Sequence, residues 1–88
     1  MINDLYWVYI TCDPRADNRL QAALAPDLSR MLRDSAHRPV IYYRQFPITL
    51  DAVAHKLLLG SLEKETLNHL IRSVNPAMTD LREEFEMK

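Results

Sequence analysis

The side chains best suited to chemistry are arginines in the first half of the chain. Arginines grouped in this way contact phosphates in nucleic-acid-binding proteins, but interleaved aspartates are equally typical of a mixed-charge surface. The sequence favours the mixed-charge surface and leaves a weak nucleic-acid interface open. The charged residues of this segment are Arg15, Arg19, Arg30, Arg33, Arg38 and Arg44, with Asp13, Asp17, Asp27 and Asp34 between them.

Three histidines, His37, His55 and His69, are candidates for acid–base chemistry or metal binding. With the single cysteine they match no zinc-finger spacing, and the sequence places no nucleophile beside His55. We therefore expect all three to be surface histidines. The neighbouring Lys56 either attracts a phosphate or carboxylate group or is a solvated lysine on an amphipathic helix, and we prefer the second interpretation.

The composition is that of an ordinary soluble domain. The chain has 88 residues, with 11 Lys and Arg against 12 Asp and Glu, so its formal net charge is −1. Nucleic-acid-binding domains usually carry a basic excess, so strong non-specific DNA binding is not expected. Cys12 cannot form an intramolecular disulfide and is expected to be a small buried hydrophobic residue. No signal peptide or apolar run of membrane-spanning length is found. We expect one cytoplasmic domain over residues 1–88, without membrane attachment.

The apolar patterning predicts an α+β fold with the element order β-β-α-β-α-α. The expected sheet is small, three-stranded and antiparallel, with helices flanking it. An acidic tail over residues 77–88 follows the last helix. The expected strands are 5–12, 19–24 and 40–46, and the expected helices are about 26–35, 50–59 and 61–73.

Several residues are expected to end or cap these elements. Thr49 and Ser61 are candidate helix caps, and Gly60 stands where a left-handed C-cap is wanted. Asn75 is interpreted as the cap of a turn before Pro76. In the tail, apolar residues are spaced to dock on the core, namely Leu81 and Phe85.

Four stretches of the chain form a specific combination in a fixed order. They are V-Y-I and then a cysteine at 8–12, D-L-x-R at 27–30, R-P-V at 38–40 before a tyrosine-rich strand, and S-x-N-P with D-L-x-E-E at 73–84. In these motifs the chain resembles the GIY-YIG endonuclease superfamily, in particular its small single-domain bacterial branch, over residues 6–85. The resemblance implies a GIY-YIG-like fold and an origin in metal-dependent DNA cleavage.

The resemblance also implies where catalytic groups would lie, and the chain departs from the family at four of five positions. Active members use two tyrosines, an arginine on the first helix, a nearby histidine or tyrosine, and a metal-binding glutamate on the second helix. Tyr9 matches the first tyrosine, although a tyrosine in this strand is more typical of a core residue. The other positions hold Gln21, Met31, Ser35 and Lys56. An ammonium group at the glutamate position repels a divalent cation, so no cofactor is expected.

The favoured hypothesis is therefore a nuclease fold that has lost endonuclease activity and works as a binding module. One form of it binds DNA weakly through Arg30, Arg33, Arg38 and Lys56. An active endonuclease with a rearranged site, which would use magnesium, is retained as the alternative.

The other form of the hypothesis is a protein-interaction module. Apolar replacements at Ala22, Ala23 and Met31 would turn the old cleft into a contact surface, and exposure of Met31 would favour this interpretation. Both a monomer and a homodimer are left open, because a free sheet edge or an apolar patch can pair symmetrically.

Overall fold

A computed structural model describes residues 5–17, 19–35 and 38–86 of the chain. It confirms the α+β fold and the predicted element order, with one short helix added in the tail. The elements are β1 (Tyr6–Asp13), a 3-10 helix (Pro14–Ala16), β2 (Arg19–Ala25), α1 (Leu28–Asp34), β3 (Val40–Phe46), α2 (Thr49–Ser61), α3 (Lys64–Val74) and α4 (Glu83–Glu86).

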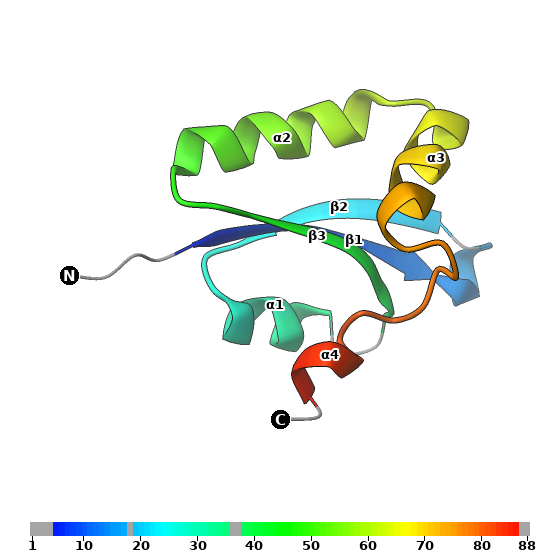
Figure 1. Cartoon of the computed structure of the whole chain (residues 1–88), viewed down its shortest axis with the longest axis horizontal. Helices are drawn as coiled ribbons and strands as arrows, with labels where there is room; N and C mark the ends of the chain where they lie inside the picture. The colour runs from blue at the N-terminus through cyan, green and yellow to red at the C-terminus, as the bar shows by residue number, and fades with distance from the viewer. Residues whose placement is uncertain (1–4, 18, 36–37, 87–88) are drawn as a thin grey trace.

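The three strands form one antiparallel sheet in the order β2-β1-β3, so β1 is the central strand. Side chains alternate along a strand, and this gives the sheet two different faces. Helices α2 and α3 cover one face, called here the α2 face, while α1 and α4 lie on the opposite side, the α1 face (Figure 1). The sheet therefore separates the second helix from the first.

Each face of the sheet has its own apolar cluster. Val8 and Ile10 of β1 point to the α2 face, whereas Trp7 and Tyr9 point to the α1 face. Burial of these side chains is the main favourable term for folding. The buried members on the α2 face are Val8, Ile10, Ile41, Tyr42, Ala52, Leu59, Leu67 and Ile71, and those on the α1 face are Trp7, Tyr9, Ala25, Met31 and Val40.

The helix ends differ from three of the predicted caps. Gly60 is not a left-handed C-cap, because α2 continues through it to Ser61 and ends in extended backbone at Leu62. The helix, with Leu59 buried against the sheet, continues past the glycine, and the half-buried Leu62 follows as its C-cap. Thr49 is the first residue of α2 and not its cap. Ser61 does not cap α3 but donates a hydrogen bond to the Leu58 carbonyl at 2.8 Å.

The side chain of Asn75 holds the tail on the molecule. Asn75 is buried at the turn that follows α3. Its Nδ2 donates hydrogen bonds to the carbonyls of Ile41 and Thr79, both at 2.9 Å. The Leu81 amide then donates to the Val40 carbonyl at 2.7 Å, at the edge of β3. These bonds guide the chain past the β3 edge to the α1 face (Figure 1).

The tail ends on the aromatic part of the α1 face. The Phe85 ring lies 5.5 Å from the Trp7 ring and 5.3 Å from the Tyr43 ring, both in edge-to-face geometry. Such pairs add stabilisation beyond the area that they bury. The predicted docking of Phe85 on the core is confirmed.

Candidate functional site on the α1 face

Tyr9 lies in the middle of β1, paired with Ala23 of β2 and Tyr43 of β3. It is 4% exposed and packs in the α1-face cluster, so the expectation of a core residue is confirmed. Burial raises the pKa of its hydroxyl above the ordinary value of 10.0, and the Asp34 carboxylate adds to the increase, while Arg30 opposes it. The hydroxyl therefore stays protonated near neutral pH.

The other family positions near Tyr9 hold groups without catalytic chemistry. Met31 is 0% exposed and belongs to the same apolar cluster. Ser35 is also buried, and its Oγ donates a hydrogen bond to the Met31 carbonyl at 2.7 Å. Gln21 is exposed on β2, opposite Thr11 of β1. This set offers neither a cation for a phosphate nor a base for water at the Tyr9 hydroxyl.

The burial of Met31 overturns the expected apolar contact surface in the old cleft. Ala22 and Ala23 are neighbours in β2, so their side chains point to opposite faces of the sheet. A joint surface of these alanines with Met31 therefore does not exist, and the expectation was wrong. Leu28, Met31 and Leu32 follow helical spacing, so the sequence already indicated that this side of α1 packs on the core.

Charges of both signs alternate at the end of the α1 face. A hollow of about 310 Å³ there is lined by Asp13, Arg15, Asp34 and Arg38. Arg30 is paired with Asp34, Nε to Oδ2 at 3.1 Å. The carboxylates offset the guanidinium groups of this region, so the geometry is that of a mixed-charge surface.

Beyond the hollow, the mixed-charge surface also contains a hydrogen bond between an arginine and an uncharged side chain. Arg38 Nη1 donates a hydrogen bond to Gln21 Oε1 at 3.2 Å, which joins the segment after α1 to β2. Arg33 is exposed on α1. Arg30 and Arg38 are therefore engaged by polar groups of the protein itself.

Lys56 is not part of this surface. It lies half-buried on α2, on the opposite side of the sheet from α1 (Figure 1). The expected nucleic-acid set is therefore divided, with Arg30, Arg33 and Arg38 on one side and Lys56 on the other. Within residues 5–17, 19–35 and 38–86, no three His, Cys, Asp or Glu residues come together as metal ligands.

His55 is not the surface residue that was expected. It is half-buried, with Nε2 2.9 Å from the Tyr42 hydroxyl and its ring 5.1 Å from the Phe46 ring. The spacing from Ala52 through His55 to Leu59 is that of a buried helix face, and this signal was available in the sequence. His69 is exposed as expected, and His37 lies outside the described residues.

The outer side of α2 carries apolar side chains that the sequence reasoning missed. Leu50 is 77% exposed and Leu57 is 66% exposed, with Ala54 exposed between them. The solvent-exposed side of the helix is thus largely apolar, with the polar Thr49 and Asp51 exposed in its first turn. The exposed residues that form this side, called here the α2 outer surface, are Leu50, Ala54, Leu57, Leu58 and Ser61.

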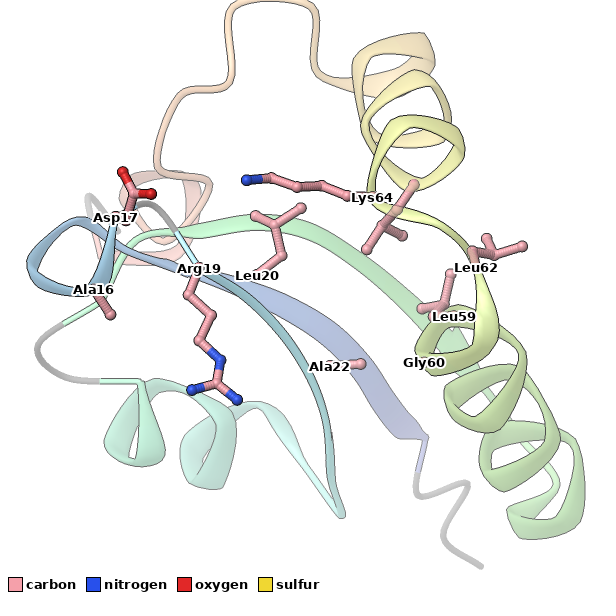
Figure 2. A pocket seen from close by; sticks show the side chains of 10 residues that line it. Ala16, Asp17, Arg19, Leu20, Ala22, Leu59, Gly60, Leu62 and Lys64 are labelled. Atoms are coloured by element: carbon pink, nitrogen blue, oxygen red, sulfur yellow. The ribbon is translucent and has the colours of Figure 1, made fainter.

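A second, larger hollow lies between β2 and the junction of α2 with α3 (Figure 2). Its volume is about 400 Å³, and it is called here the β2 groove. Apolar side chains dominate it, with charged residues near its mouth. The lining residues are Ala16, Asp17, Arg19, Leu20, Ala22, Leu59, Gly60, Leu62, Lys64 and Leu67.

Comparison with known proteins gives no match among protein-family models, curated proteins or solved structures. The resemblance to the GIY-YIG superfamily therefore stays a prediction from the motifs. In the described part of the chain, no helix combines the length and the apolar character that a membrane span requires.

Proposed function

We propose that this protein is a protein-interaction module, without catalysis, on a fold of the GIY-YIG nuclease type. The motifs in the sequence and the order of strands and helices support the fold in this proposal. The buried Met31 and Ser35 support the absence of nuclease chemistry, because neither can stabilise charge on a phosphate. Lys56, across the sheet from Tyr9, supports it as well.

The α2 outer surface is the observation that carries the interaction part of the proposal. Single exposed apolar residues are normal, but here the exposed leucines lie on one side of one helix. Leu50, Leu57 and Leu58 are each more than half exposed. Leucines that are exposed together on one side of a helix are suited to being covered by another protein.

The spacing of this surface fits a second copy of the same chain. Leu50, Ala54, Leu57 and Ser61 follow the alternating four- and three-residue steps of a heptad seam. If two α2 helices pair antiparallel about a twofold axis, Leu57 meets Ala54 of the other copy, and Leu50 meets Ser61. Large residues then face small ones, which is the complementarity that close packing requires.

A nucleic-acid interface is supported less well. Binding to phosphates at physiological salt depends on several cations that act together. On the α1 face, Arg30 is paired with Asp34, and the nearby hollow contains as many carboxylates as guanidinium groups. The active endonuclease is supported least, because its catalytic positions hold uncharged or misplaced groups.

Chemical cross-linking tests the proposed pairing. In a Cys12→Ser background, Ala54→Cys should cross-link to a covalent dimer with a short bismaleimide, since the two copies of position 54 lie near the axis. Glu65→Cys, exposed on α3, is the matched control and should not form the covalent dimer. Equal cross-linking of both variants, or of neither, would overturn the proposal.

A further inference from the structure

The β2 groove runs beside a free sheet edge. β2 is an outer strand, and within the described residues only β1 pairs with it. The opposite outer strand, β3, is partly covered by the tail, because the Val40 amide donates a hydrogen bond to Asp80 Oδ1 and the Val40 carbonyl accepts one from the Leu81 amide. An uncovered strand edge presents backbone donors and acceptors that can pair with another extended chain.

The floor of the groove is apolar, and its walls come from different elements. Leu20 and Ala22 of β2 point toward the α2 face. Leu59 of α2, Leu62 between the two helices and Leu67 of α3 line the hollow with them. A volume of about 400 Å³ is in the range of binding cavities for small groups. The hollow is large enough for a side chain the size of leucine or phenylalanine.

A single ammonium group sits over this floor. Lys64, the first residue of α3, lines the groove together with Leu20, and its side chain extends away from the helix (Figure 2). Among the described residues Lys64 forms no ion pair within 4.0 Å. An ammonium group beside an apolar pocket is complementary to a ligand that carries an apolar group and a carboxylate close together.

We propose that the β2 groove binds an extended acidic peptide, which adds as a strand to the outer edge of β2. A leucine-sized side chain of the peptide fills the hollow, and a carboxylate side chain two residues away, on the same side of the strand, reaches Lys64. In this mode backbone hydrogen bonds supply affinity, and pockets for alternate side chains supply specificity.

Gly60 allows the groove to be closed without damage to the fold. It lines the hollow within α2, and a Cβ atom built on it meets no atom within 4 Å. Its backbone is helical, so a side chain causes no strain there. Gly60→Leu should therefore occupy part of the hollow while the helix stays folded.

This site goes beyond the proposed pairing through α2 and fails independently of it. The peptide would bind between β2 and the last turn of α2, whereas self-association would use the leucines on the outer side of α2. A protein that binds peptide but sediments as a monomer would refute only the pairing. A dimer that ignores peptide would refute only the groove.

The test is a backbone-amide NMR titration with a blocked hexapeptide that has one leucine, one glutamate two residues later, and threonine elsewhere. Up to about 5 mM peptide, the expected shifts are in β2 and around Gly60 and Lys64. A matched peptide with methylated backbone amides should bind at least about tenfold more weakly, since it cannot pair with a strand. Absence of shifts, shifts elsewhere, or equal binding of the methylated peptide would overturn the proposal.

Variants of the protein make the test specific. Gly60→Leu and Lys64→Glu should each weaken peptide binding by about tenfold or more. Arg72→Glu removes an exposed cation from the same helix outside the groove and should leave binding unchanged. If Gly60→Leu binds as the wild type does, or Arg72→Glu loses as much as Lys64→Glu, the groove is not the site.

Discussion

The Tyr42 hydroxyl lies 2.9 Å from Nε2 of His55 and joins the edge strand β3 to helix α2. The two rings are also stacked, with centroids 6.1 Å apart. Together with the buried Ala52 and Leu59, this contact holds α2 over the sheet with its leucines directed outward. The interaction surface that we propose therefore depends on a polar contact on its inner side.

The free energy of unfolding should fall in mild acid because of His55. Burial, with a further contribution from Arg44, lowers the pKa of His55 below its ordinary value of 6.5, so the unfolded chain takes up a proton more readily than the folded one. The stability contributed by neutral His55 is complete above pH 6.5 and is lost as the pH falls toward the lower folded-state pKa. Urea unfolding at about pH 7.5 and about pH 5.5 measures the loss.

The matched variants for this measurement are His55→Gln and His69→Gln. His55→Gln should reduce the difference between the two pH values, whereas His69→Gln, at an exposed position on α3, should keep it. The same pH dependence in wild type and His55→Gln would show that another group is responsible.

Removal of the Asn75 amide should detach the tail from the sheet. Asn75→Ala leaves the buried Ile41 carbonyl and the Thr79 amide without their partner, at a cost of about 2 kcal/mol in the free energy of unfolding. Thermal or urea unfolding measures this cost. Asn68→Ala, at a half-buried position on α3, is the control and should change it by less than about 0.5 kcal/mol. Equal effects of both would contradict the structural role of Asn75.

Gly60→Ala should stabilise the protein by about 0.5 kcal/mol, because alanine has the higher helix propensity and its Cβ meets no neighbour. The sign of the change is informative. A left-handed cap at Gly60, as the sequence suggested, would make the same substitution destabilising by about 1 kcal/mol. Urea unfolding of the two proteins distinguishes these conformations.

Local patterns in the sequence were sufficient for the strands. The span 40–46 was predicted to the residue, because a β-branched and aromatic run lies between Pro39 and Pro47. The end of α2 was missed, since a lone glycine suggests a stop, but the helix, with Leu59 buried, continues to Ser61. Burial by tertiary contacts overrides a local signal in such cases.

The candidate site was harder to predict than the fold, because it depends on which face of the sheet each helix covers. The sequence placed Lys56 on the second helix correctly. It contains no local signal that α2 and α1 lie on opposite faces of the sheet. The burial of Met31, in contrast, agrees with the helical spacing that it shares with Leu28 and Leu32. Helical spacing could have indicated the orientation of His55 and Leu57. His55 is spaced with the buried positions of α2, and Leu57 is spaced with the exposed ones.

Restoring the family's acidic residue should not restore nuclease activity. Lys56→Glu would place a carboxylate on α2, across the sheet from Tyr9 and from the arginines of α1. Wild type and Lys56→Glu should both leave supercoiled plasmid intact with magnesium or manganese, and Lys64→Glu is the charge-matched control. Metal-dependent nicking that disappears with Tyr9→Phe would contradict the non-catalytic account.

The central claim is that the α2 outer surface is a contact surface for a second copy. Sedimentation velocity over about 10 μM to about 1 mM measures it most directly. Wild type should shift from monomer toward dimer with concentration, Leu57→Glu should remain a monomer, and Thr66→Glu, exposed on α3, should behave as wild type. A wild-type protein that stays monomeric throughout, or a dimer that Leu57→Glu leaves intact, would contradict the account.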